Sequence, residues 1–121
     1  MRNPLIFAVC VLLLILLGCA RVPEEASDLD GEIISVGRSV DSEAVQILVE
    51  AHPGQSDGLD MAYVFILDDR AVFLRENDAD RGAAVADLEE GQRVKVWFDG
   101  PVAESYPVQG TARAVLIVSD P

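Results

Sequence analysis

The stretch RVKVWFD, residues 93–99, alternates between apolar and polar side chains. Such a period of two predicts a β-strand with one face buried. The dipeptide Gly100-Pro101 follows directly and marks the end of the strand. The side chains expected to point inward are Val94, Val96 and Phe98, whereas Lys95 and Trp97 are expected to point outward.

Five other segments carry strand signals, and turn residues separate them. Two of them, residues 61–67 and 112–119, are apolar on both faces, which is typical of central buried strands. Asp68-Asp69 predicts a tight turn that pairs residues 61–67 and 71–75 as a hairpin. The predicted strands are residues 32–38 (EIISVGR), 44–51 (AVQILVEA), 61–67 (MAYVFIL), 71–75 (AVFLR) and 112–119 (ARAVLIVS).

The region between the fourth and fifth strands is polar. Residues 77–82 are expected to form a loop, and residues 83–90 a single helical turn that Gly91 ends. Short strands at this spacing predict an all-β domain over residues 31–121. We expect a small five- to six-stranded, OB-like Greek-key barrel with one short helical turn. A small open sandwich is the alternative.

The N-terminal sequence is typical of a lipoprotein signal peptide. Residues 5–17 are all apolar, which fits a signal peptide and is shorter than the roughly 20 residues of a membrane-spanning helix. The segment Leu16-Leu17-Gly18-Cys19 that follows resembles a lipobox. We therefore expect a signal peptide over residues 1–18, cleavage between Gly18 and Cys19, and a diacylglyceryl anchor on Cys19. An uncleaved anchor helix and a secreted form are the alternatives.

Residues 19–30 would then be a lipidated N-terminus and a flexible acidic tether. Cleavage removes Arg2 and no acidic residue, leaving 8 basic and 21 acidic residues and a net charge of −13. This charge excludes nucleic acid as a partner, because such binding depends on neutralising phosphates. Cys10 leaves with the signal and Cys19 is modified, so we expect no disulfide and no thiolate metal site.

Three segments resemble the YobA-like family of exported bacterial lipoproteins. They are Gly31-Glu32-Ile33, residues 87–98 (DLEEGQRVKVWF) and residues 104–112 (ESYPVQGTA). The resemblance implies an OB-like β fold and a position on the outer face of the cytoplasmic membrane of a Gram-positive bacterium. The function of that family is unknown, so the resemblance implies no catalytic residue and no cofactor.

Three residues are candidates for binding a ligand or a partner. Tyr106 and Gln109 lie in the segment before the last strand, and Trp97 is expected to face outward. Aromatic side chains dominate interface hot spots, and barrel mouths often hold small-molecule sites. The structural alternative is that Tyr106 packs over the barrel end, that Gln109 caps backbone groups, and that residues 100–110 cover Trp97.

Metal binding and catalysis receive little support. Asp78, Asp80 and Glu89 have a faint calcium-loop spacing, but Gly82 and Ala83 stand where an oxygen ligand and a glycine are required. His52 is the only histidine, and no serine lies in a nucleophile context. We expect no metal site, no cofactor and no enzymatic activity. A different kind of calcium site remains an alternative, and it would use these three acidic residues or Asp57, Asp60, Asp68 and Asp69.

The sequence therefore predicts a lipid-anchored protein of the cell envelope that acts as a non-enzymatic binding or accessory module. Its partner would be an envelope protein or a small ligand. Two alternatives remain. One is an acidic interaction or inhibitory protein that docks a cationic envelope partner, and the other is a calcium-binding envelope domain.

Overall fold

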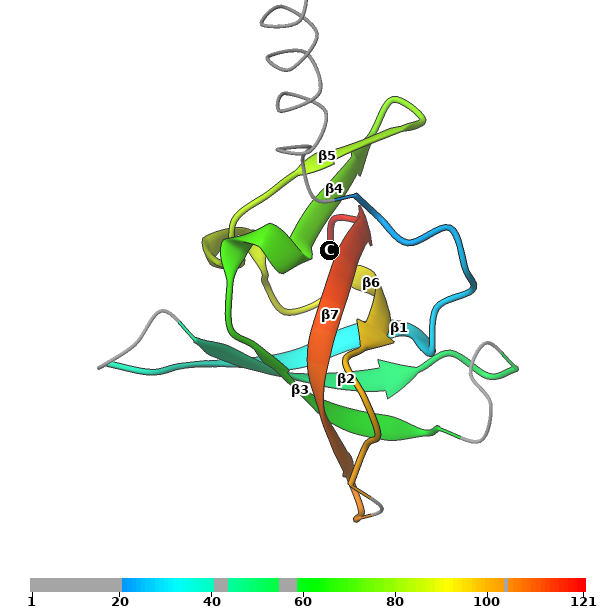
Figure 1. The fold of residues 1–121 in the computed structure, drawn as a ribbon, viewed down its shortest axis with the longest axis vertical. Coiled ribbons are helices and arrows are strands. Elements are labelled where there is room, and N and C mark those ends of the chain that lie inside the picture. The colour runs from blue at the N-terminus through cyan, green and yellow to red at the C-terminus, as the bar shows by residue number, and fades with distance from the viewer. Residues whose placement is uncertain (1–20, 41–43, 55–58, 104) are drawn as a thin grey trace, which may run out of the picture.

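A computed structural model describes residues 21–40, 44–54, 59–103 and 105–121. In these ranges the chain forms seven strands and two short 3-10 turns (Figure 1). No helix in these ranges has the length and apolar character needed to span a membrane. The elements are β1 (Leu29–Arg38), β2 (Val45–Ala51), β3 (Met61–Ile66), η1 (Asp69–Ala71), β4 (Val72–Glu76), β5 (Ala79–Gly82), η2 (Val85–Asp87), β6 (Arg93–Phe98) and β7 (Val108–Ser119).

Five of the strands close into a barrel. Their order is β1-β2-β3-β7-β6, and β6 pairs again with β1. All neighbours are antiparallel except β3 and β7, which run parallel. This confirms the predicted all-β, OB-like barrel and not the open sandwich. Closure gives each of these strands a hydrogen-bonded neighbour on both sides, which removes the exposed edges.

The long strand β7 joins the barrel to a small extension of the sheet. Along one edge it pairs first with β3, through residues 108–111, and then with β4, through residues 115–117. Strand β5 pairs with β4 and continues the sheet beyond the barrel. The predicted hairpin between β3 and β4 is therefore wrong. The turn η1, capped by the Asp68 carboxylate, carries the chain from one neighbour of β7 to the next.

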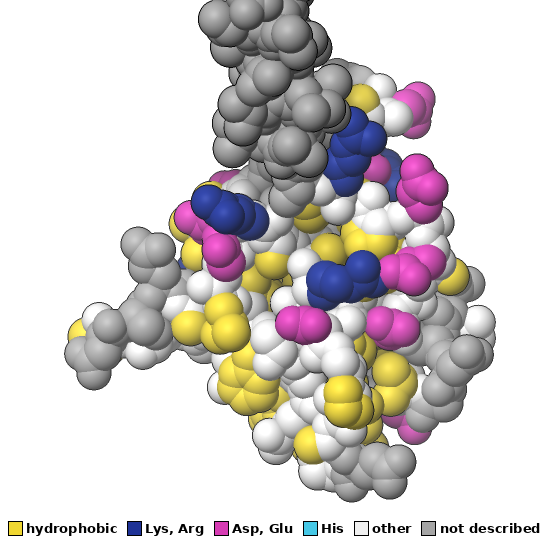
Figure 2. Space-filling model, in the orientation of Figure 1, with side chains coloured by type: hydrophobic (Ala, Val, Ile, Leu, Met, Phe, Trp, Pro, Cys, Tyr) yellow, Lys and Arg dark blue, Asp and Glu magenta, His cyan; other side chains and the backbone are white. Residues whose placement is uncertain are grey.

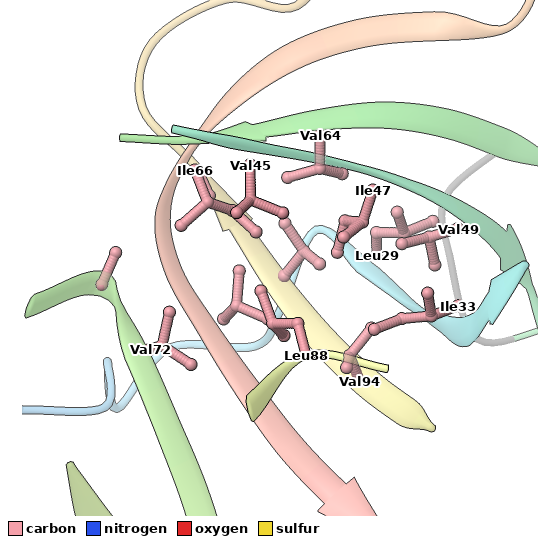
Figure 3. Close-up of a cluster of buried hydrophobic side chains, with 14 of the residues drawn as sticks. Leu29, Ile33, Val45, Ile47, Val49, Val64, Ile66, Val72, Leu88 and Val94 are labelled. Carbon is pink, nitrogen blue, oxygen red and sulfur yellow. The ribbon is translucent and has the colours of Figure 1, made fainter. Parts of the chain in front are cut away.

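The core lies inside the barrel and follows the period of two. The inward positions of β2 and β3 are 0–3% exposed, and Val94 and Val96 of β6 are fully buried (Figure 3). Leu88, just after η2, enters the same core. The predicted helical turn is thus present as the 3-10 turn η2, and Gly91 follows it at a φ of 88°. Burial of each large aliphatic side chain contributes about 1.5–3 kcal/mol.

Three segments differ clearly from the prediction. Strand β7 begins at Val108, four residues before the predicted start at residue 112, so Gln109 lies in the strand and not in the segment before it. Residues 79–82, expected to lie in a loop, form β5, because Asn77 and Asp78 adopt φ values of 52° and 63° and close a tight hairpin. Asparagine and aspartate tolerate this left-handed conformation better than other residues with side chains. At the other end, β1 begins at Leu29, three residues before the predicted strand, and the Leu29 side chain is fully buried.

Candidate binding surface

The barrel wall is a single layer, so the outward side chains of its strands meet solvent unless another segment covers them. Two apolar groups lie on this outer surface. The first surrounds Trp97 and is buried, and the second lies on β2 and β3 and is half-exposed. Because only the second group is accessible to solvent, it is the candidate binding site.

The Trp97 group contains Phe73, Trp97, Ala114 and Leu116, which are 0–5% exposed. A β-bulge at Arg113 places Ala112 toward the core and Ala114 toward Trp97, because Ala112 pairs with Phe98 and Ala114 with Trp97. The prediction that Trp97 lies on the outward face of its strand is confirmed. It is nevertheless only 3% exposed, so it is not available to a partner in this structure.

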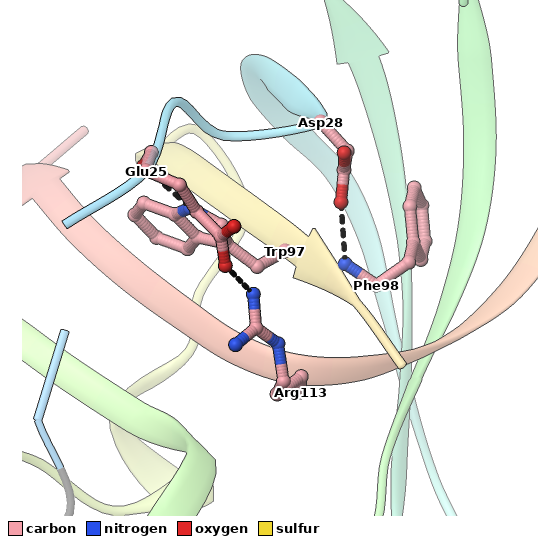
Figure 4. Close-up of polar contacts among 5 residues, drawn as sticks. All are labelled: Glu25, Asp28, Trp97, Phe98 and Arg113. Atoms are coloured by element: carbon pink, nitrogen blue, oxygen red, sulfur yellow. Dashed lines mark hydrogen bonds and ion pairs between the residues drawn. The ribbon is translucent and has the colours of Figure 1, made fainter. Parts of the chain in front are cut away.

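Residues 22–28, here called the strap, cover Trp97 (Figure 4). The indole Nε1 of Trp97 donates to the backbone carbonyl of Glu25 at 2.9 Å, and the Glu25 carboxylate pairs with Arg113. Asp28 accepts a hydrogen bond of 2.9 Å from the Phe98 amide. The segment expected to be a flexible tether thus has fixed contacts from Val22 onward, and this segment, rather than residues 100–110, covers the indole.

The second apolar group is named here the open face. Its members point outward from adjacent strands in register, since Leu48 pairs with Tyr63 and Tyr63 with Gln109. Four are half-buried and Gln109 is exposed. Figure 2 shows hydrophobic side chains at the surface of the lower half of the barrel, over β3 and the first half of β7. The open face consists of the apolar residues Leu48, Met61, Tyr63 and Phe65 and of the polar Gln109 beside Tyr63 on β7.

A hollow of about 480 Å³ adjoins the open face at the start of β3. Its lining includes Tyr106, which is 79% exposed, and two acidic residues, Glu50 and Asp60. None of the described residues that line it is lysine or arginine. The hollow therefore joins an aromatic ring and apolar surface to two negative charges. Its lining is Glu50, Ala51, His52, Pro53, Gly54, Leu59, Asp60, Met61 and Tyr106.

The structure brings together two of the three predicted binding residues. Tyr106 borders the hollow and Gln109 belongs to the open face, at the same end of β7. Trp97 lies opposite Ala114, five residues farther along β7 than Gln109, which corresponds to about 17 Å. Met61, Tyr63 and Phe65 were not predicted as site residues. The sequence contains a signal for them, namely that residues 61–67 are apolar on both faces. In a barrel only one face of a strand points into the core, so the other apolar face lies at the surface unless another segment covers it.

Among the described residues, those weighed for metal binding and catalysis do not assemble. Within the described ranges no three His, Cys, Asp or Glu side chains lie close enough to hold a metal ion. The Asp80 carboxylate pairs with Arg75 at 3.1 Å instead of facing Glu89. His52 borders the hollow, and its backbone amide donates to the Asp30 carbonyl at 2.9 Å. Gly18, Cys19 and Asp57 lie outside the described residues.

An ion pair between buried Asp30 and partly exposed Arg93 fixes the start of β1 beside this region. Asp30 is 3% exposed, and both of its carboxylate oxygens accept hydrogen bonds from Arg93, at 3.0 and 3.1 Å. The hydrogen bond and the negative charge of Asp30 raise the pKa of Arg93. Two parallel bonds between a guanidinium and a carboxylate hold both groups in one geometry. The pair is therefore assigned to the framework of the barrel and not to the site.

Comparison with known proteins identifies a family but no activity. A family model described as "Protein of unknown function (DUF3221)" matches residues 36–119, which is most of the chain and most of the barrel. The protein belongs to this family. No curated protein matches the chain. No solved structure matches it either.

Proposed function

We propose that this protein is a non-enzymatic binding module of the bacterial cell envelope, anchored to the outer face of the cytoplasmic membrane by lipid on Cys19. Its binding surface is the open face together with the Tyr106 hollow. Within the DUF3221 family, the proposal places it with the YobA-like exported lipoproteins. The observation that carries the proposal is the half-buried, outward-facing row Met61, Tyr63 and Phe65 on β3.

The contrast between the two outer apolar groups supports a partner for the open face. The chain covers Trp97 with its own strap and buries it, whereas Tyr63 and Phe65 are only half-buried. A row of large apolar side chains on a single barrel wall is typical of an interaction site. Tyrosine supplies large contact area with few rotatable bonds, so such a row binds at low entropic cost.

The charge around the hollow favours a basic partner. Glu50 and Asp60 add two negative charges to the lining, and the exposed ring of Tyr106 attracts a cation through its π-face. Four of the arginines already form ion pairs with acidic side chains of this chain. The whole chain carries a net charge of −12, which adds long-range attraction for cations. We therefore propose a segment of an envelope protein that combines lysine or arginine with apolar side chains.

Titration of the purified mature protein in detergent micelles tests this proposal. The probe is a synthetic peptide of alternating lysine and leucine, and a peptide with glutamate in place of lysine is its control. Binding of the lysine peptide that weakens with added salt, with no binding of the glutamate peptide, is the expected result. Equal binding of both peptides, or none, would contradict the proposed partner.

Variants locate the site. Tyr63→Ala and Tyr106→Ala should each weaken binding by about tenfold or more, which is typical of a central aromatic contact. Glu50→Gln should reduce the salt dependence. The matched control is Glu90→Gln, which removes an exposed carboxylate from the turn before β6 and should leave binding unchanged. Unchanged binding in both tyrosine variants would exclude the open face and the hollow.

A further inference from the structure

The strap is held along its length by the barrel. Glu25 contacts both Trp97 and Arg113, and Val22 packs against the Trp97 group. At its other end the Asp28 amide donates to the Val96 carbonyl at 2.9 Å, and Leu29 enters the core directly afterward. Within the described chain, the folded unit therefore extends back at least to Val22, seven residues before the first residue of β1.

The proposed lipid-bearing residue is close in sequence to these contacts. Cys19 lies three residues before Val22 in the sequence. Three extended residues span at most about 10 Å, whereas the full stretch from Cys19 to Gly31 would span about 40 Å if it were free. A lipid on Cys19 would consequently sit close to the part of the barrel that the strap contacts.

That part of the barrel is remote from the proposed binding surface. Val22 and the strap residues border a hollow together with Arg75 and Asp80 of the β4–β5 hairpin. In Figure 1 the described chain begins beside this hairpin, and the β6–β7 loop that carries Tyr106 lies at the opposite end. Along β7, Ala114 beside Trp97 and Val108 near Tyr106 are separated by six residues, or about 20 Å.

We infer that the strap gives the anchored domain a fixed orientation, with the β4–β5 hairpin toward the bilayer and the Tyr106 hollow away from it. The inference rests on the lipid anchor of the proposed function. It makes the hollow accessible to partners in the cell wall or on neighbouring proteins. A domain on a ten-residue flexible tether would instead present all of its faces to the bilayer in turn.

Energy transfer to the membrane tests this orientation. Two single-cysteine variants of the lipidated protein, Ala79→Cys in β5 and Ser105→Cys before Tyr106, are labelled with a donor dye and reconstituted in vesicles that contain an acceptor lipid. Both positions are exposed, so labelling leaves the core intact. Transfer from residue 79 should exceed transfer from residue 105 by about twofold, given the separation of the two ends along β7. Equal transfer from both positions would overturn the fixed orientation.

A matched variant separates the role of the strap from that of the anchor. Ten Gly and Ser residues inserted after Ala20 lengthen the chain before the strap and leave its contacts in place. The difference between positions 79 and 105 should then disappear, because the linker reaches about 15–20 Å and turns freely. A difference that persists would overturn the role of the short connection. Failure of the protein to float with vesicles would overturn the anchor itself, whereas peptide binding by the open face is measured independently.

Discussion

The indole Nε1 of Trp97 donates a 2.9 Å hydrogen bond to the backbone carbonyl of Glu25, which lies 72 positions earlier in the chain. This contact closes the outer apolar group around Trp97. It also makes residues before β1 part of the fold, although they lie outside the range that matches the family model. This hydrogen bond helps to hold the strap over the Trp97 group, which is buried, whereas the open face is only half-buried.

Trp97→Phe should lower the free energy of unfolding by about 1–3 kcal/mol, because it removes the hydrogen bond and part of a buried ring. Urea unfolding followed by circular dichroism measures this loss. The control is Glu25→Gln, which keeps the backbone acceptor and removes only the half-exposed ion pair with Arg113. That variant should lose less than about 1 kcal/mol. Equal losses in both variants would show that the indole contact is not the main attachment of the strap.

Gly31→Ala should destabilise the barrel by about 1–3 kcal/mol or more. A Cβ at this position would overlap the Glu50 carbonyl group, whose carbon would be 2.7 Å away, and backbone atoms of a paired strand cannot move aside easily. Gly37→Ala is the control in the same pair of strands, since its Cβ would meet the Gln46 carbonyl oxygen at 3.7 Å, an ordinary contact. Thermal unfolding of the two variants should differ clearly, and equal melting temperatures would refute the close approach of β1 and β2.

Asp30→Asn should cost about 1–3 kcal/mol, because it weakens two charge-assisted hydrogen bonds in a buried position. Asp80→Asn, which breaks the more exposed pair with Arg75, should cost at most about 1 kcal/mol. Chemical unfolding of both variants provides the comparison. A smaller loss for Asp30→Asn than for Asp80→Asn would contradict the framework role of Asp30.

The same pair has a defined dependence on pH. The pKa of Arg93 is raised in the folded state by Asp30, so the associated stabilisation is fully present below the pKa of an unfolded arginine. It is lost only as the pH rises through the raised value. Titration of Arg93 should therefore contribute no change in unfolding free energy across the neutral range. A stability change in that range that disappears in Arg93→Gln would contradict this assignment.

Tyr106→Ala should leave stability within about 0.5 kcal/mol of the parent, since the side chain is 79% exposed. Differential scanning calorimetry can establish this before any binding measurement. Loss of peptide binding in a variant of unchanged stability would then reflect a lost contact. A large drop in melting temperature would instead assign Tyr106 the structural role of packing over the barrel end.

Local patterning was sufficient to predict most of the barrel. Strands β2 and β6 carry clean alternation, and glycine and proline residues mark their ends. The predicted pairing of β4 with β3 is wrong because β4 pairs with β7 instead. Strand β7 begins more than thirty residues later in the chain, and no local sequence signal indicates this pairing. Strand β5 was missed because its four residues are all exposed, so it lacks an apolar period.

The site was predicted only in part, for two physical reasons. The strap attaches to Trp97 through a backbone carbonyl, and every residue has one, so its sequence carries no signal for the contact. The apolar character of both faces of β3 was interpreted as burial between layers, which would hold in a sandwich. In a single-walled barrel the same pattern leaves Tyr63 and Phe65 at the surface.

The most direct test of the account is a map of amide chemical shifts during titration of the isotope-labelled mature protein with the lysine–leucine peptide. The largest shifts should fall on the open face and the hollow, at Leu48, Tyr63, Tyr106 and Gln109. Trp97 and the strap should remain unaffected. Shifts centred on Trp97 and Glu25, with none at Tyr63, would contradict it.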